Sequence, residues 1–149
     1  MQRREWLAAA AVAVATVAAL AACSRSDPER ELRATIDSMA RALEQRRPGD
    51  FLDAVAEDFT RESGAFGKQE VKRVLAGVLL RNEKINLAVV VTEVQVQVQG
   101  ERARAQLRVV AAGGAGLLPE RGQVWEFHTA WRRERGAWKV YNAEWREGL

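Results

Sequence analysis

The chain holds one cysteine and one histidine, and their positions limit the chemistry that the sequence can support. Cys23 follows a run of small apolar residues, whereas His128 lies in an aromatic-rich segment near the C-terminal end. A lone cysteine excludes a disulfide within the chain and a cysteine-rich metal site, and a single histidine leaves the usual zinc ligand sets incomplete. The sequence therefore predicts no metal and no cofactor. Cys23 remains a thiol available for covalent modification.

Residues 1–22 have the pattern of an export signal. Arg3 and Arg4 give a positive start, and the segment from Leu7 to Ala22 contains no charge. A permanent transmembrane helix needs about 20 apolar residues, so this alanine-rich segment favours a cleaved signal peptide. General secretion is the predicted route, and the sequence "RREWL" at residues 3–7 leaves twin-arginine export as the alternative.

The sequence Leu20-Ala21-Ala22-Cys23 resembles the lipobox of bacterial lipoproteins, in which small residues precede a cysteine that receives diacylglycerol. The resemblance implies that Cys23 becomes the first mature residue and holds the protein on a membrane through its acyl chains. Ser24 in place of aspartate implies the outer membrane, facing the periplasm, rather than the inner membrane. The predicted organisation is a signal peptide (1–22), a short tether (23–27) and one domain (28–149).

Charge is mixed along the chain rather than clustered. The chain has 23 Lys and Arg residues and 20 Asp and Glu residues, which gives a formal net charge of +3. A nucleic-acid partner requires a clustered basic surface, and the signs alternate too often to form one. Export to the cell envelope argues in the same direction, so no nucleic-acid partner is expected.

Three helices are expected before any long strand. Residues 28–47 have apolar side chains at three- and four-residue spacing, after Ser26 or Asp27 as the helix cap and Pro28 at the first helical position. A shorter helix is predicted over residues 51–59, capped by Asp50, and a third over residues 68–82 with one apolar stripe that is predicted to pack as ordinary core.

Four strands are expected after residue 84, where the apolar period becomes two. Residues 85–100 and 101–112 read as a long antiparallel hairpin, followed by strands over 123–134 and 137–147. Trp138 and Val140 share a phase that Trp145 breaks, which predicts a β-bulge or strong coiling of the strand near Tyr141 to Ala143. Trp125 and Trp131 add to this aromatic cluster, which must line the main core or a cavity.

The order of these elements is typical of an α+β domain. The "EDF" at residues 57–59, the alternating "ARAQLRV" at 103–109 and the closing "WRRERGAWKVYNAEW" at 131–145 resemble the nuclear transport factor 2-like superfamily. The resemblance implies three N-terminal helices packed in a strongly curved, mostly antiparallel sheet of about four to six strands. It also implies a cone-shaped cavity, which some members use for catalysis and others for binding.

Enzymes of this superfamily typically use an Asp, or an Asp with a His, inside the cavity. Asp58 is the candidate inward acid here, although the favoured interpretation is a carboxylate that caps a loop or pairs with Arg61. His128 shares strand parity with Glu126, opposite the tryptophan face, so it is predicted to point away from the cavity. The candidate pocket residues are Trp125, Phe127, Thr129, Tyr141, Asn142 and Asp58.

These observations favour a lipid-anchored cell-envelope protein with a non-catalytic domain that binds a small apolar ligand or another envelope protein. The first alternative is a small cavity enzyme of the isomerase or dehydratase type. The second is an assembly module that forms a homodimer through the outer sheet face, where Gln95 and Arg104 belong to a polar surface. The fold alone does not decide among these functions.

Overall fold

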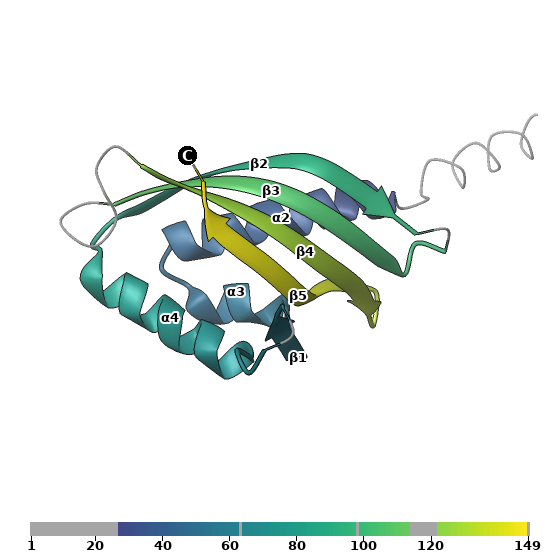
Figure 1. The fold of residues 1–149 in the computed structure, drawn as a ribbon, viewed down its shortest axis with the longest axis horizontal. Helices are drawn as coiled ribbons and strands as arrows, with labels where there is room; N and C mark the ends of the chain where they lie inside the picture. The colour runs from purple at the N-terminus through teal and green to yellow at the C-terminus, as the bar shows by residue number, and fades with distance from the viewer. Residues whose placement is uncertain (1–26, 63, 98, 114–121, 149) are drawn as a thin grey trace, which may run out of the picture.

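The computed structural model describes residues 27–62, 64–97, 99–113 and 122–148, so the predicted signal peptide and Cys23 lie outside the described residues. Within these ranges, three helices accompany one sheet of five strands in the order β1-β5-β4-β3-β2 (Figure 1). The elements are α2 (Pro28–Glu44), α3 (Pro48–Asp53), β1 (Val55–Arg61), α4 (Lys68–Arg81), β2 (Ile85–Val96), β3 (Arg102–Gly113), β4 (Gln123–Glu134) and β5 (Ala137–Glu147). The predicted α+β fold class is confirmed. No described helix is both long and apolar enough to cross a membrane.

The helix α2 begins as its sequence predicts. One side-chain oxygen of Asp27 accepts hydrogen bonds from the backbone N–H groups of Glu29 (3.0 Å) and Arg30 (3.4 Å), and Pro28 follows Asp27 in the first turn. The helix packs against β2 and α3. Its buried face has the expected helical spacing and consists of Leu32, Ile36, Met39, Ala40 and Ala42.

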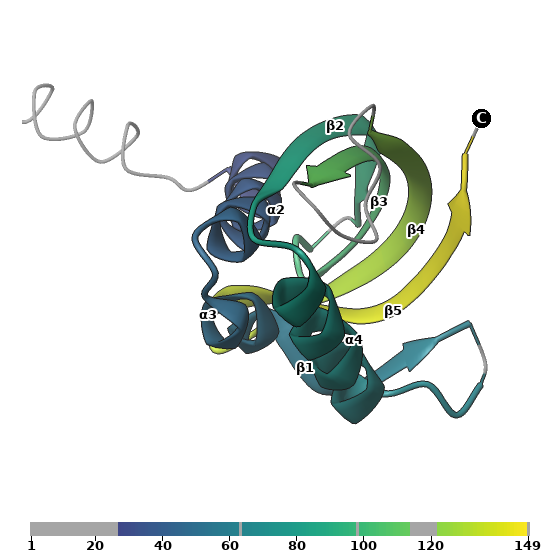
Figure 2. The ribbon, with the colours of Figure 1, turned by 90° about the vertical axis from the view of Figure 1, so that its left-hand side faces the viewer.

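The four long strands form an antiparallel meander that curls around the helices. Figure 2 shows the sheet arching over one side while α2, α3 and α4 close the other. Alternate residues of β3 and β4 face inward, among them the buried Ala103, Ala105 and Trp131. An extra residue, Thr92, interrupts the β2–β3 register, and such a bulge increases the local bend of a strand.

A second bulge lies in β5, where the sequence predicts one. Val140 pairs with Trp131 and Asn142 pairs with Ala130, so Tyr141 is the extra residue. The bulge changes the parity of the strand, and the inward positions after it are Ala143 and Trp145. The bulge therefore accounts for the break in phase between Val140 and Trp145 from which it was predicted.

The prediction of a helix over residues 51–59 is wrong for most of that range. Helix α3 ends at Asp53, and Val55–Arg61 form the edge strand β1, which pairs in parallel with β5. The backbone N–H of Val140 also donates to the carbonyl oxygen of Ala54 (2.9 Å). Pairing with a free sheet edge outweighs the weak helical preference of this segment. Asp50 lies in the first turn of α3 and is not its N-cap, which is Arg47.

Arg46 ties the C-terminal end of α4 to the turn between α2 and α3. Its guanidinium donates to the carbonyl oxygens of Asn82 (2.7 Å), Glu83 (3.2 Å) and Leu79 (2.5 Å). These carbonyls include the last acceptors of the helix, which have no partner inside it and carry the negative end of the helix dipole. Arg46 therefore holds α4 in position relative to α2.

Arg46→Ala is expected to lower the free energy of unfolding by about 1–2 kcal/mol, because hydrogen bonds from a charged donor to three carbonyls are lost. Amide hydrogen exchange is expected to accelerate in the last turn of α4. Arg47→Ala, at the exposed neighbouring position, is the matched control. Arg46 has φ 60, so Arg46→Gly relieves backbone strain while it removes the same hydrogen bonds. The free energy of unfolding of this variant is expected to lie between those of the two alanine variants. Equal stability of the two alanine variants would contradict this role.

Candidate functional site

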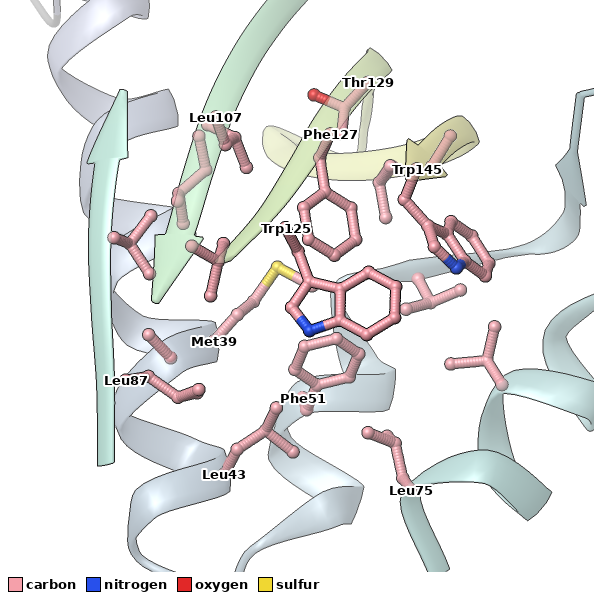
Figure 3. A pocket seen from close by; sticks show the side chains of 18 of the residues that line it. Met39, Leu43, Phe51, Leu75, Leu87, Leu107, Trp125, Phe127, Thr129 and Trp145 are labelled. Atoms are coloured by element: carbon pink, nitrogen blue, oxygen red, sulfur yellow. The ribbon is translucent and has the colours of Figure 1, made fainter. Parts of the chain in front are cut away.

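An apolar cavity of about 390 Å³ lies between the inner face of the sheet and the three helices (Figure 3). Pockets that bind small molecules commonly have volumes of about 300–1,000 Å³. All eight described elements contribute to its walls, with Met39 and Leu43 from α2 and Phe51 from α3. The sheet contributes Leu87, Val89, Leu107, Val109, Trp125, Phe127, Thr129, Trp131 and Trp145, among others.

Aromatic rings form one wall of this cavity. Trp125, Phe127 and Trp131 alternate along β4, which places them on its inner face. Trp145 of β5 packs against Phe127 with ring centroids 6.0 Å apart, and against Phe66 in an edge-to-face contact at 5.4 Å. Such contacts hold the rings in defined positions. The aromatic segment found in the sequence therefore lines a cavity as well as a core.

The opposite wall is the apolar stripe of α4. This stripe was expected to pack as ordinary core, but α4 packs against β1 and α3, and its Val71, Leu75 and Val78 face the cavity. Val74 lines the same space and remains 52 % exposed, so the cavity opens beside α4. The separation between α4 and the long strands β2 to β5 leaves the space open.

Thr129 is the only hydroxyl-bearing residue among the described residues of the cavity wall, and its hydroxyl is already engaged. It donates to the carbonyl oxygen of Ala105 (2.7 Å) and accepts from the indole N–H of Trp131 (2.7 Å). No described lining residue carries a side chain that ionises. The wall can therefore enclose an apolar molecule, but it offers no acid or base for proton transfer.

Asp58 lies outside the cavity, which corrects its assignment as a candidate pocket residue. Its side chain is 65 % exposed, and both carboxylate oxygens accept hydrogen bonds from Arg132. These hydrogen bonds keep the pKa of Asp58 below its ordinary value. The expectation of an ion pair is met by Arg132 and not by Arg61.

Tyr141 and Asn142 also lie outside the cavity and line the groove on the outer face. Tyr141 follows the inward Val140 and faces the other side of the sheet, and the bulge removes Asn142 from the inward phase. The amide group of Asn142 donates to the carbonyl oxygens of Thr60 (3.1 Å) and Glu62 (2.7 Å) and thereby joins β5 to β1. The Tyr141 ring lies near two guanidinium groups, those of Arg102 (5.5 Å) and Arg132 (5.3 Å). Of the six candidate residues, the structure brings Trp125, Phe127 and Thr129 together in the cavity.

His128 lies on the outer face of the sheet, as its strand parity predicts. It is exposed and pairs across the strands with Gln106 and Glu144. These residues, with Glu93 and Arg104, line a polar groove of about 470 Å³. Among the described residues, no cluster of His, Asp or Glu has the arrangement of a metal site.

The helical side of the cavity was not predicted from the sequence. Met39 and Leu43 of α2 and Phe51 of α3 line it together with the α4 stripe. Their helical spacing was visible in the sequence, but the same spacing is expected for a filled core. Trp145 is recovered once the predicted bulge is applied to its phase.

Comparisons with known proteins identify the fold. No family model matches the chain, and no curated protein matches it in sequence. A solved structure from Novosphingobium aromaticivorans, provisionally described as a scytalone dehydratase, aligns over 81 % of this chain and 84 % of its own, with 16 % identity and a TM-score of 0.67. A ketosteroid isomerase-like protein from Erwinia carotovora atroseptica aligns over 80 % and 95 %, with 15 % identity and a TM-score of 0.61.

A third similar structure, from Streptomyces avermitilis, is provisionally described as a dehydratase of the nuclear transport factor 2-like family. It aligns over 80 % of this chain and 96 % of its own, with 17 % identity and a TM-score of 0.63. Together with the curved sheet and its helices, these similarities show that the domain has the nuclear transport factor 2-like cone fold. At this level of identity they show the fold alone.

Proposed function

We propose that this protein is a lipid-anchored cell-envelope protein whose domain binds an apolar small molecule in the cavity. The observation that carries the proposal is the composition of the wall. Aliphatic and aromatic side chains surround about 390 Å³, and the one hydroxyl is engaged within the protein. A pocket of this kind gains binding free energy by removing apolar ligand surface from water.

The anchor in this proposal is diacylglycerol on Cys23, at the outer membrane and facing the periplasm. Folded structure starts close to that position, because Asp27 caps α2. A tether of residues 23–27 spans at most about 17 Å, so the domain would stay beside the bilayer. Pro28 is held by a hydrogen bond from Trp138 (3.1 Å), whereas Leu43 near the other end of α2 lines the cavity.

The alternative function is a cavity enzyme of the isomerase or dehydratase type. The descriptions of the similar structures as a dehydratase and an isomerase-like protein support it. Such chemistry needs an acid or base within hydrogen-bond reach of the substrate. The nearest acid suggested by the sequence, Asp58, is paired with Arg132 outside the cavity. The wall of this chain therefore favours binding, and a bound ligand recovered unchanged after prolonged incubation would agree with that choice.

A homodimer through the outer sheet face remains a further proposal. Its basis is the polar groove around His128, where Glu93 and Glu144 lie near Arg104. Native mass spectrometry of the full chain in detergent measures the oligomeric state. A monomer at high concentration would remove this proposal without affecting the cavity.

Val89→Trp is expected to weaken binding of a neutral apolar probe, N-phenyl-1-naphthylamine, by about tenfold or more. Val89 lines the cavity, and a larger side chain there occupies ligand volume. Val90→Trp is the matched control, because Val90 is the next residue of β2 and is 57 % exposed on the other face. Probe fluorescence gives the dissociation constant, and urea unfolding checks that both variants fold. Equal probe binding by the two variants would contradict binding in this cavity.

A further inference from the structure

The start of α2 and two turns between strands form one end of the domain, which we call the turn end. It consists of Pro28, the β2–β3 turn at Gly100, and the β4–β5 turn at Arg135 and Gly136. A side chain at position 100 would meet the Pro28 ring, with its Cβ 3.3 Å from Cγ of Pro28, so α2 touches the β2–β3 turn. Arg133 links the same elements, because its guanidinium donates to the carbonyl oxygen of Gly100 (3.0 Å) and to the carboxylate of Glu31 (2.5 Å). The described chain therefore enters the domain at the turn end.

Packed core lies directly behind the turn end. Leu32 of α2 is 0 % exposed, Ala103 of β3 and Trp138 of β5 are almost as deeply buried, and none of the three lines the cavity. The indole N–H of Trp138 donates to the carbonyl oxygen of Pro28 (3.1 Å), which joins this core to the start of α2. The core therefore separates the turn end from the cavity.

The cavity extends toward the opposite end of the domain. Its wall includes Leu43 near the end of α2, Leu87 near the start of β2, Ala111 near the end of β3 and Trp125 near the start of β4. The 17 residues of α2 extend about 25 Å, which sets the scale of the separation from the turn end. Figure 1 shows α4, beside which the cavity opens, at the end of the molecule opposite the two turns.

Three exposed guanidinium groups at the turn end have no ion-pair partner among the described residues, namely those of Arg30, Arg102 and Arg135. Glu101 and Asp27 oppose them, and Asp27 is already used as the cap of α2. Three further acidic residues are neutralised by ion pairs with arginines, namely Glu29, Glu31 and Glu134. A guanidinium presents N–H groups that match two phosphate oxygens at once. The free arginines of the turn end therefore suit a surface of phosphate groups.

We propose that the turn end of the acylated protein rests on the phosphate groups of the bilayer surface, and that the cavity opens away from this bilayer. The inference rests on the anchor of the proposed function, because the tether of residues 23–27 reaches at most about 17 Å. An inverted domain, with its opening on the bilayer, would hold Asp27 about 25 Å above the surface, beyond the reach of the tether. The ligand then enters and leaves on the periplasmic side, and not directly from the lipids that hold the anchor.

The test compares the heights of two positions above vesicles of phosphatidylethanolamine and phosphatidylglycerol that carry the full acylated chain. Glu101→Cys places a thiol at the turn end, and Leu80→Cys places one on α4, where Leu80 is 87 % exposed. Cys23 is the only native cysteine and its sulfur is acylated, so a maleimide fluorophore labels the new thiol alone. Energy transfer to an acceptor on the lipid headgroups is expected to be several-fold greater from position 101 than from position 80. Equal transfer, or greater transfer from position 80, would overturn the proposed orientation.

The contact with phosphate is tested by adding Arg102→Gln and Arg135→Gln to both labelled chains. Loss of these two guanidinium groups is expected to reduce the difference in energy transfer between the two positions. Arg47→Gln with Arg81→Gln is the matched control, because both residues are exposed and lie at the opposite ends of α2 and α4 from the turn end. An unchanged difference in the Arg102 and Arg135 variant would overturn the contact. Absence of transfer from both positions would overturn the anchor together with this inference, whereas probe binding in the cavity would be unaffected.

Discussion

Trp131→Ala is expected to lower the free energy of unfolding by about 4 kcal/mol, within the usual range of about 3–5 kcal/mol for removing a buried tryptophan. Trp131 is 2 % exposed and belongs to the core cluster that includes Leu32 and Val140. The substitution also removes the N–H that donates to Thr129. Because small domains are stable by only about 5–15 kcal/mol, much of the total would be lost. Urea unfolding followed by circular dichroism measures the change.

Trp125→Ala is the matched control for this prediction. Trp125 lies on the same face of β4, but it is only partly buried and donates no hydrogen bond to the described residues. Its removal enlarges an existing space instead of opening a new one in packed core, so the loss should be clearly smaller. Equal losses in the free energy of unfolding for Trp131→Ala and Trp125→Ala would contradict the assignment of Trp131 to the packed core and Trp125 to the cavity wall.

The long strands could be predicted from the sequence because their alternation survives over many residues. The strand predicted over 123–134 matches β4, and the breaks in phase around Tyr141 correctly located the β5 bulge. Each of these signals is local. A strand whose inner residues are aromatic and whose outer residues are charged has only one face to bury.

The strand β1 could not be predicted in this way. Its residues Val55, Ala56 and Phe59 are buried, at a spacing that fits a helix better than an alternating strand. What decides the outcome is the partner, since β5 presents a free edge that pairs with β1 in parallel. That edge is formed by residues far along the chain, so no local pattern reports it.

The cavity was predicted in kind but not in its full extent. Three inward positions on its wall hold alanine, namely Ala40, Ala111 and Ala143. Small residues at these places leave volume that larger side chains would fill. Apolar spacing in α4 is the same for a helix packed on a sheet and for one that faces an open space, so only the assembled structure separates core from cavity. Tyr141 and Asn142 were assigned to the pocket for a related reason. The sequence located the bulge, but it did not show which residues beside the bulge face the cavity.

Cys23→Ser is expected to abolish fatty-acid labelling and the requirement for detergent, which makes it the largest change expected for any single substitution outside the core. Acylation requires the sulfur nucleophile, and a serine hydroxyl is far less reactive. Each buried methylene contributes about 0.8 kcal/mol, and two or more acyl chains hold a protein on a bilayer where a single chain does not. Metabolic labelling with a radioactive fatty acid, followed by membrane fractionation, measures both effects. Ser24→Ala at the next position is the control and should keep the label.

Cys23→Ser is also expected to leave the domain unchanged, because the start of α2 is capped by Asp27 and held at Pro28 by a hydrogen bond from Trp138. Probe binding by the unacylated variant should therefore match that of the wild type, which separates anchoring from ligand binding. The uncleaved signal peptide is a second route to the membrane, so N-terminal mass spectrometry must accompany fractionation. A wild-type protein that still begins at Met1, or a Cys23→Ser variant that still takes up label, would refute the anchor. In either case the cavity would be unaffected, because its wall residues lie within the described domain.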